Sequence, residues 1–118
     1  MYKIYISGAI KNNPNYVRDF AKAKEHLEKL GFEVLSPLDT YAYRNNLPVK
    51  MCMFESLNLL RKADLVTFIT EGIKSKGMSI ERDLAEYCEI PIINYCMFEG
   101  VTRVDFYKEG KDEKRKNK

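Results

Sequence analysis

The sequence has little of what a metal site or a disulfide framework requires. It contains one histidine, His26, and three cysteines, Cys52, Cys88 and Cys96, with no C-x-x-C pair among them. An odd number of separated cysteines and a single imidazole argue against both a zinc site and a disulfide framework. We therefore expect buried, reduced thiols that pack as small hydrophobic side chains, and we expect neither a metal nor a cofactor.

The chain also lacks a long hydrophobic run. No apolar stretch approaches the roughly eighteen residues that a membrane-spanning helix needs, so we expect no membrane partner. Residues 1–6 lead straight into a strand-like pattern and do not have the layout of a signal peptide. These two features predict a cytoplasmic protein.

Outside one terminal segment the chain has no excess of positive charge. Residues 108–118 contain six basic and three acidic side chains, which account for the whole formal net charge of +3. A basic tail can bind nucleic acid through its charge, but a lysine-rich end without aromatic residues is typical of a disordered, solubilising terminus. We therefore predict one domain over residues 1–107 and a disordered tail over 108–118, and we do not expect a nucleic-acid partner.

Strand-like and helix-like patterns alternate along the chain, which is typical of an α/β fold with a mostly parallel sheet of four or five strands. Asn13 and Pro14 provide an N-cap and a first-turn proline for the first helix, and Gly31 closes it. We expect residues 38–48 to form an irregular loop. The expected strands are 2–7, 32–35, 65–70, 91–96 and an edge strand 101–107. The later helices are expected at 49–62 and 78–89. In the first of these two helices we expect Met51, Phe54, Leu57 and Leu60 to face inward.

Three polar strand exits should meet at one edge of this sheet, because ligands of open parallel sheets bind at the carboxyl ends of the strands. The exits are residues 7–11, 36–37 and 72–77. The last of them opens a helix, and the backbone N–H groups at such a turn can bind an anion. Glu81 follows about one helical turn later. An acid beside an anion site predicts chemistry on a phosphorylated or polar small molecule.

Three motifs occur in order along the chain: Tyr5-Ile6-Ser7-Gly8-Ala9-Ile10-Lys11, then Ala63-Asp64, then Ser75-x-Gly77-x-x-x-Glu81 before a helix that ends in Ile90-Pro91-Ile92-Ile93. Together they resemble the nucleoside 2-deoxyribosyltransferase superfamily over about residues 2–95. The most similar subgroups are small phage and bacterial members of unassigned function and the nucleotide N-glycosidases. The resemblance implies a Rossmann-like, flavodoxin-related three-layer fold. It also implies a homodimer whose subunits help to close each other's pockets.

The resemblance assigns the chemistry to Glu81 as nucleophile. Its carboxylate would attack the anomeric carbon of the sugar, expel the base and form a glycosyl-enzyme ester, which water or a second base resolves. The position of Tyr5 matches a tyrosine that orients this carboxylate through its hydroxyl. From the residues alone, Tyr5 is equally well interpreted as a core aromatic with a satisfied hydroxyl.

The resemblance also indicates the substrate. Ser75 stands where nucleoside-specific transferases have an aspartate for the sugar 5′-hydroxyl, and a serine beside backbone amides suits a 5′-phosphate instead. Lys11 would add positive charge opposite that phosphate, and Ser7, Gly8 and Gly77 would complete the phosphate and sugar pocket. We therefore predict cleavage or transfer of the N-glycosidic bond of a (deoxy)nucleoside 5′-monophosphate.

One position departs from the family pattern. The aspartate that assists the leaving base is replaced by Ser56, with Glu55 and Asp39 as possible substitutes. Because general acid–base assistance is worth about 10²–10⁴ in rate, the alternative is a catalytically impaired module that binds a nucleotide in order to sense or sequester it. A third hypothesis is a structural partner that uses the basic tail on nucleic acid.

Overall fold

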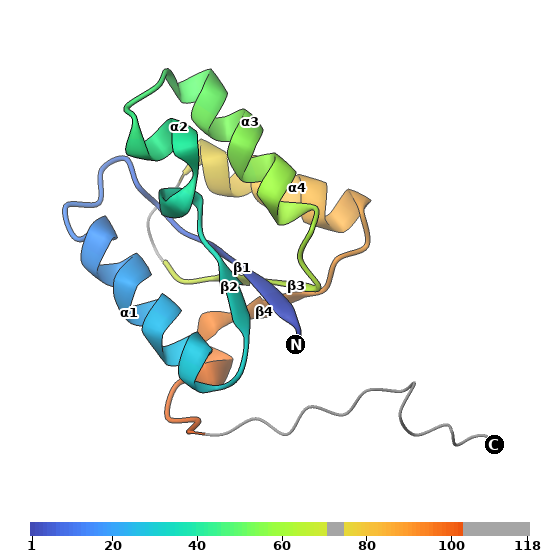
Figure 1. Cartoon of the computed structure of the whole chain (residues 1–118). Helices are drawn as coiled ribbons and strands as arrows, with labels where there is room; N and C mark the ends of the chain where they lie inside the picture. Colours follow the sequence, from blue (N-terminus) through green and yellow to red (C-terminus); the bar gives the residue numbers. More distant parts are fainter. Residues whose placement is uncertain (71–74, 103–118) are drawn as a thin grey trace.

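A four-stranded parallel sheet forms the centre of the protein (Figure 1). The computed structural model describes residues 1–70 and 75–102. The strand order is β2-β1-β3-β4, which confirms the predicted α/β class and parallel sheet. Each strand is shorter than predicted, and the strands are β1 Lys3–Ser7, β2 Glu33–Leu35, β3 Leu65–Phe68 and β4 Ile92–Asn94.

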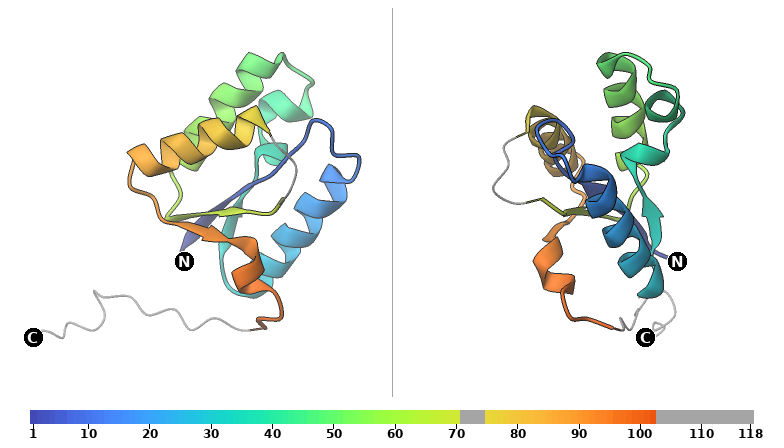
Figure 2. Two further views of the ribbon diagram at one scale, coloured as in Figure 1. Left: turned by 180° about the vertical axis from the view of Figure 1, so that it is seen from behind. Right: turned by 90° about the vertical axis from the view of Figure 1, so that its left-hand side faces the viewer.

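Helices cover both faces of the sheet, as a three-layer fold requires (Figure 2). Helix α1 (Tyr16–Lys29) packs on one face, and α3 (Val49–Leu60) and α4 (Lys76–Tyr87) lie side by side on the other. Among the helices of the described residues, none is both long and apolar enough to span a membrane. The predicted tail 108–118 and residues 103–107 of the predicted edge strand lie outside the described residues.

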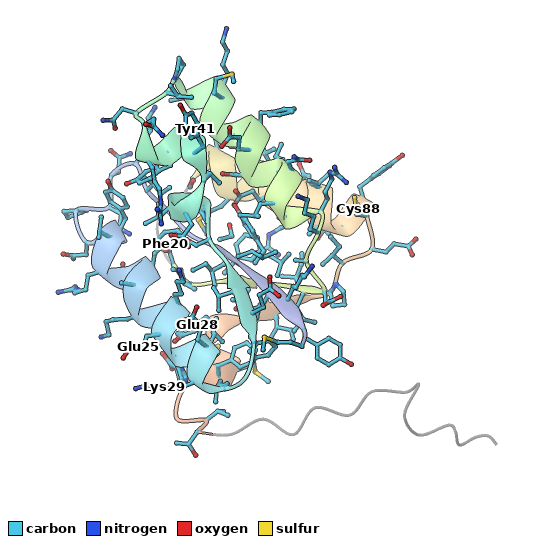
Figure 3. All side chains as sticks on the ribbon, in the orientation of Figure 1. Phe20, Glu25, Glu28, Lys29, Tyr41 and Cys88 are labelled. Atoms are coloured by element: carbon cyan, nitrogen blue, oxygen red, sulfur yellow. The ribbon has the colours of Figure 1, made fainter. Side chains whose placement is uncertain are left out.

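Successive side chains of a strand point to opposite sides, so alternate residues of β1 face opposite sides of the sheet. Ile4 and Ile6 join the core under α1, whereas Tyr5 packs with Leu60 and Ala85 under α3 and α4. Figure 3 shows Phe20 on the inner side of α1, with Glu25, Glu28 and Lys29 on its outer side. The site described below lies on the face that α3 and α4 cover.

The predicted start of the first helix is wrong by two residues. Helix α1 begins at Tyr16, with Asn15 rather than Asn13 as its N-cap. Asn13 is buried; its Nδ2 donates to the carbonyl of Ala9 at 3.0 Å, and its Oδ1 accepts from the N–H of Asn15 at 3.1 Å. The side chain therefore closes the turn before the helix, a local bond that asparagine often makes instead of capping.

The predicted irregular loop at 38–48 contains helical structure. A 3-10 turn, η1 (Pro37–Asp39), leads into a short helix, α2 (Tyr41–Arg44). Thr40 caps α2 by accepting a hydrogen bond from the N–H of Tyr43 at 3.2 Å. A helix of this length is too short to produce a hydrophobic period, so only Thr40 as a cap residue could have indicated it.

Two predictions of burial are also wrong. On α3, Met51 is 40% exposed and Phe54 is 65% exposed, because the residues that face the sheet are Ser56 and Leu60. The cysteines are free thiols as expected, but Cys88 and Cys96 are exposed and only Cys52 is half-buried. Cys88 lies at the C-terminal end of α4 (Figure 3).

Candidate functional site

Glu81 is a buried acid held by two hydroxyl groups from β1. Its Oε2 accepts a hydrogen bond from the hydroxyl of Tyr5 at 2.7 Å, and its Oε1 accepts one from the hydroxyl of Ser7 at 2.5 Å. Tyr5 and Ser7 reach it together because residues two apart on a strand share a face. Only 6% of Glu81 is exposed. The structure therefore fixes both oxygens of this carboxyl group beneath α4.

The surroundings shift the pKa of both partners. Burial raises the pKa of the Glu81 carboxyl, while the hydrogen bonds from Ser7 and Tyr5 oppose that rise. Burial raises the pKa of the Tyr5 phenol well above its usual value, and the nearby charge of Glu81 and the hydrogen bond to it raise that pKa further. The Tyr5 hydroxyl therefore keeps its proton and acts as the donor of the hydrogen bond to Glu81. The ionised carboxylate is the form that accepts from both hydroxyls.

Ser56 extends this cluster from the other helix. Its side chain is buried on α3, and its hydrogen bond with Tyr5 acts to lower the pKa of the phenol. Side chains from β1, α3 and α4 thus lie together here: the hydroxyls of Tyr5 and Ser7 donate to Glu81, and Ser56 lies close enough to the Tyr5 hydroxyl to act on its pKa. Sequence reasoning noted Ser56 only as a missing acid and did not find its contact with Tyr5.

Neither of the substitute acids joins this cluster. Glu55 accepts a hydrogen bond from the N–H of Ala42 at 2.9 Å and so supports the start of α2. Asp39 pairs with Lys24 at 2.8 Å and with Arg44 at 3.1 Å. Both carboxylates already hold structural partners away from Glu81. Within residues 1–70 and 75–102, no group of three histidine, cysteine, aspartate or glutamate side chains could hold a metal ion.

Ser75 and Gly77 lie at the N-terminus of α4. The helix begins at Lys76, two residues earlier than predicted, so Gly77 belongs to its first turn. Ser75 is the N-cap, and its Oγ accepts a hydrogen bond from the N–H of Met78 at 3.3 Å. The other first-turn N–H groups have no partner within a helix. Gly72 and Lys74, which the sequence also placed at this exit, lie outside the described residues.

Gly8 is required by packing where β1 leaves the sheet. A Cβ atom there would lie 2.8 Å from both Ile69 Cγ1 and Thr70 Oγ1, and 3.2 Å from a ring carbon of Phe20. At Gly77, by contrast, a Cβ would meet Met53 at 3.4 Å and Ser75 at 3.6 Å, which are near-normal contacts. Lys11 follows in an exposed turn before α1. Close packing therefore explains why a glycine occurs at position 8, and the sequence alone did not show this.

Comparison with solved structures supports this architecture. The protein is similar to a 2-deoxyribosyltransferase from the psychrotolerant bacterium Bacillus psychrosaccharolyticus, with a TM-score of 0.56 and 17% sequence identity over 96% of this chain and 90% of that chain. At this identity the likeness shows the fold. It agrees with the fold that the sequence motifs implied.

Comparison at the level of sequence identifies the family. No curated protein matches the chain. A family model described as "Domain of unknown function (DUF4406)" matches residues 2–94, which is most of the chain and includes Tyr5, Ser7 and Glu81. The chain belongs to the DUF4406 family.

Proposed function

We propose that this protein cleaves or transfers the N-glycosidic bond of a nucleoside, with Glu81 as the nucleophile. The observation that carries the proposal is the buried carboxylate of Glu81, held on one oxygen by Tyr5 and on the other by Ser7. Likeness in fold to a 2-deoxyribosyltransferase supports the same class of reaction. An acid fixed in this way is unusual for a surface helix, where glutamate normally stays exposed and mobile.

The proposed chemistry proceeds in two steps. In the first, an oxygen of ionised Glu81 bonds to the anomeric carbon, and the bond from that carbon to the base nitrogen breaks with its electron pair going to the base. In the second, water or another base attacks the same carbon and releases the carboxylate. Tyr5 and Ser7 keep the carboxylate in one orientation throughout, which lowers the entropic part of the barrier.

We further propose that the substrate is a (deoxy)nucleoside 5′-monophosphate. The first-turn N–H groups of α4, the hydroxyl of Ser75 and the charge of Lys11 offer a binding site for the phosphate. Gly77 adds no side chain to that turn, although it is half-buried and lies beside Met53. The same helix carries Glu81, about one turn further on, so phosphate binding would bring the sugar toward the nucleophile.

The leaving base would depart without help from a carboxylic acid. Ser56 stands where the nucleoside 2-deoxyribosyltransferases that the sequence resembles have an aspartate, and it lies near the Tyr5 hydroxyl. General acid–base assistance is worth about 10²–10⁴ in rate, so turnover should be slow relative to enzymes that have the acid. We propose that Ser56 supports Tyr5 rather than the base.

A catalytically impaired nucleotide-binding module is the second candidate, and the same Ser56 favours it. Such a module would keep the phosphate site and lose the chemistry. Calorimetry separates the two: submicromolar binding of a nucleoside monophosphate, with no free base after a day, favours the module over the enzyme.

The direct test is incubation of the purified protein with a panel of nucleosides and their 5′-monophosphates, followed by chromatography for free base. Wild type should release base, and release should be faster from monophosphates. Glu81→Ala should abolish it, whereas Glu86→Gln, which changes an exposed acid on the same helix, should leave it intact. Mass spectrometry should find a sugar phosphate attached to the peptide that contains Glu81. Equal turnover by wild type and Glu81→Ala would reject the nucleophile.

A further inference from the structure

One stripe of side chains on α3 runs from open solvent to the candidate nucleophile. It consists of Val49, Met53, Ser56 and Leu60, whose spacing of four, three and four residues puts them on one side of the helix. Val49 is 70% exposed, Met53 is half-buried, Ser56 is 6% exposed and Leu60 is fully buried. Ser56 lies near the Tyr5 hydroxyl. We call the first three residues of the stripe the α3 wall.

Above Ser56 the α3 wall is apolar. The Cε of Met53 lies 3.4 Å from the Cβ position of Gly77, so the wall meets the first turn of α4, where we place the phosphate. A methionine thioether makes favourable contacts with aromatic rings, which suits the planar base of a nucleoside. Because Val49 is largely exposed, the outer edge of a base held here would face water.

The acidic protons beside the wall are already used in hydrogen bonds. Cys52 precedes Met53 on α3, and its thiol donates to the carbonyl of Leu47 at 3.5 Å. The hydroxyl of Tyr43 donates to the hydroxyl of Tyr16 at 2.5 Å. Burial raises the pKa of Tyr43 to about 12, together with that hydrogen bond and the nearby Tyr16 and Cys52. Neither the thiol nor this phenol is therefore poised to protonate a base.

The remaining groups near the wall are poor acids as well. Ser56 offers a hydroxyl in place of a carboxyl group, and burial raises the pKa of the Tyr5 phenol well above its usual value. Lys50 and Lys76 are exposed, and an ammonium group is a much weaker acid than a carboxylic acid. The two carboxylates that could replace the missing acid hold structural partners elsewhere.

We propose that this site selects substrates by how readily their base leaves as an anion, and so favours electron-poor bases. The inference rests on the proposed glycosidic reaction and adds to it the class of base. When the bond to Glu81 forms, the electron pair of the glycosidic bond stays on the base nitrogen. The base anion then takes a proton from water at the open end of the wall. The hydroxide that remains hydrolyses the glycosyl ester, so the sum of the steps consumes one water.

The absence of an acid makes the rate sensitive to the electronic character of the base. An electron-withdrawing substituent stabilises the departing anion, but it also makes the ring nitrogens less basic. In an enzyme that protonates the base, these two effects oppose each other and the rate changes little. Without protonation only the first effect remains, so the substituent should accelerate release.

The experiment compares bases with and without one fluorine, which is close to hydrogen in size. The substrates are the deoxynucleosides of 5-fluorouracil and uracil, and of 2-fluoroadenine and adenine, as free nucleosides and as 5′-monophosphates. For wild type, kcat/KM for base release at pH 6.5 should be at least about tenfold higher for the fluorinated member of a pair. Ser56→Asp, which restores the acid, should reduce this ratio to about twofold or less.

Asn58→Asp is the matched control, because it adds the same carboxyl group on the opposite side of α3. Asn58 already accepts a hydrogen bond from Arg61 Nε at 2.8 Å, which an aspartate can also accept. The fluorine ratio should stay at the wild-type value in this variant. A ratio that falls as far as in Ser56→Asp would overturn the role assigned to position 56.

The contact of the wall with the base has a separate test. Met53→Ala should raise KM for both members of a pair by up to about tenfold and leave their ratio unchanged. Met51→Ala, at a 40% exposed position on another side of α3, should leave KM unchanged. An unchanged KM in Met53→Ala would overturn the placement of the base on the wall.

The wild-type ratio needs no variant, so it decides the question even if Ser56→Asp misfolds. Equal release of both members by wild type overturns this inference and leaves the proposed reaction standing. Release from none of the substrates rejects the proposed reaction, and this inference with it.

Discussion

Tyr5→Phe isolates the contribution of one hydroxyl to the candidate nucleophile. The phenol of Tyr5 donates to Glu81 Oε2 at 2.7 Å, and the residue is fully buried, so phenylalanine keeps the packing and removes only the donor. No water can easily take its place. A hydrogen bond to a charged group is worth about 1.5–3 kcal/mol.

The sign of the effect follows from which form the hydroxyl stabilises. Tyr5 donates to the ionised carboxylate and so lowers the pKa of Glu81, against the burial that raises it. Removing the donor should raise the pKa of Glu81 by about 1–2 units, since one unit corresponds to about 1.4 kcal/mol. The proposed reaction needs the ionised form, which is lost as the pH falls through this pKa. The acid limb of the activity profile should therefore move to higher pH.

The assay is base release from the best substrate of the panel, measured as kcat/KM between pH 4 and 9. Tyr5→Phe should shift the acid limb upward by about 1–2 units and, at a pH well above it, should lower kcat more than it changes KM. Tyr87→Phe, which removes an exposed hydroxyl from α4, is the control and should leave the profile unchanged. An acid limb that stays in place in Tyr5→Phe refutes the role of this hydroxyl.

Three further predictions concern stability, each measured by urea unfolding. Thr67→Val should stabilise the fold by about 1 kcal/mol, because the Thr67 hydroxyl is fully buried without a hydrogen-bond partner among the described residues. Valine has nearly the same shape, so the packing should not change. A loss of stability would mean that the hydroxyl does have a partner. Gly8→Ala should cost about 1–3 kcal/mol, since its Cβ would lie 2.8 Å from Ile69 and Thr70, and a neutral change would mean that β1 and β3 adjust freely. Glu89→Gly should stabilise the fold by about 1 kcal/mol, because Glu89 has a φ of 60°, which glycine adopts more easily. Glu89 lies just after α4, where the N–H of Ile90 donates to the carbonyl of Ala85. Glu86→Gly, inside the helix, should instead destabilise the fold.

The strands and long helices could be predicted because their signals are local. The apolar run at 65–68 and the amphipathic pattern of 16–29 depend only on neighbouring residues, and these elements appear where expected within a few residues. The boundaries moved where a side chain found a tertiary or turn partner instead. Asn13 hydrogen-bonds to the carbonyl of Ala9 rather than capping α1. Glu55 accepts a hydrogen bond from the start of α2, a helix that no hydrophobic periodicity predicts.

The chemical nature of the site was present in the sequence, but its arrangement was not. Ser7 was predicted as a wall of the substrate pocket, and the structure shows its hydroxyl on Glu81 instead of free. The sequence indicated only that Ser56 lacks the carboxylic acid expected at its position, and the structure places it near Tyr5. A hydroxyl group carries no sequence signal for which of several buried acceptors it will meet.

Sequence alone determined that strands and helices alternate, that the sheet is parallel, and that one glutamate follows the turn after the third strand, because periodicity, turn residues and motif order are properties of the linear chain. Tertiary structure decided that Tyr5 and Ser7 meet Glu81, 76 and 74 residues further along, and that Phe54 faces solvent. Such contacts depend on the register of strands and the rotation of helices about their axes, which the packing of the whole core sets.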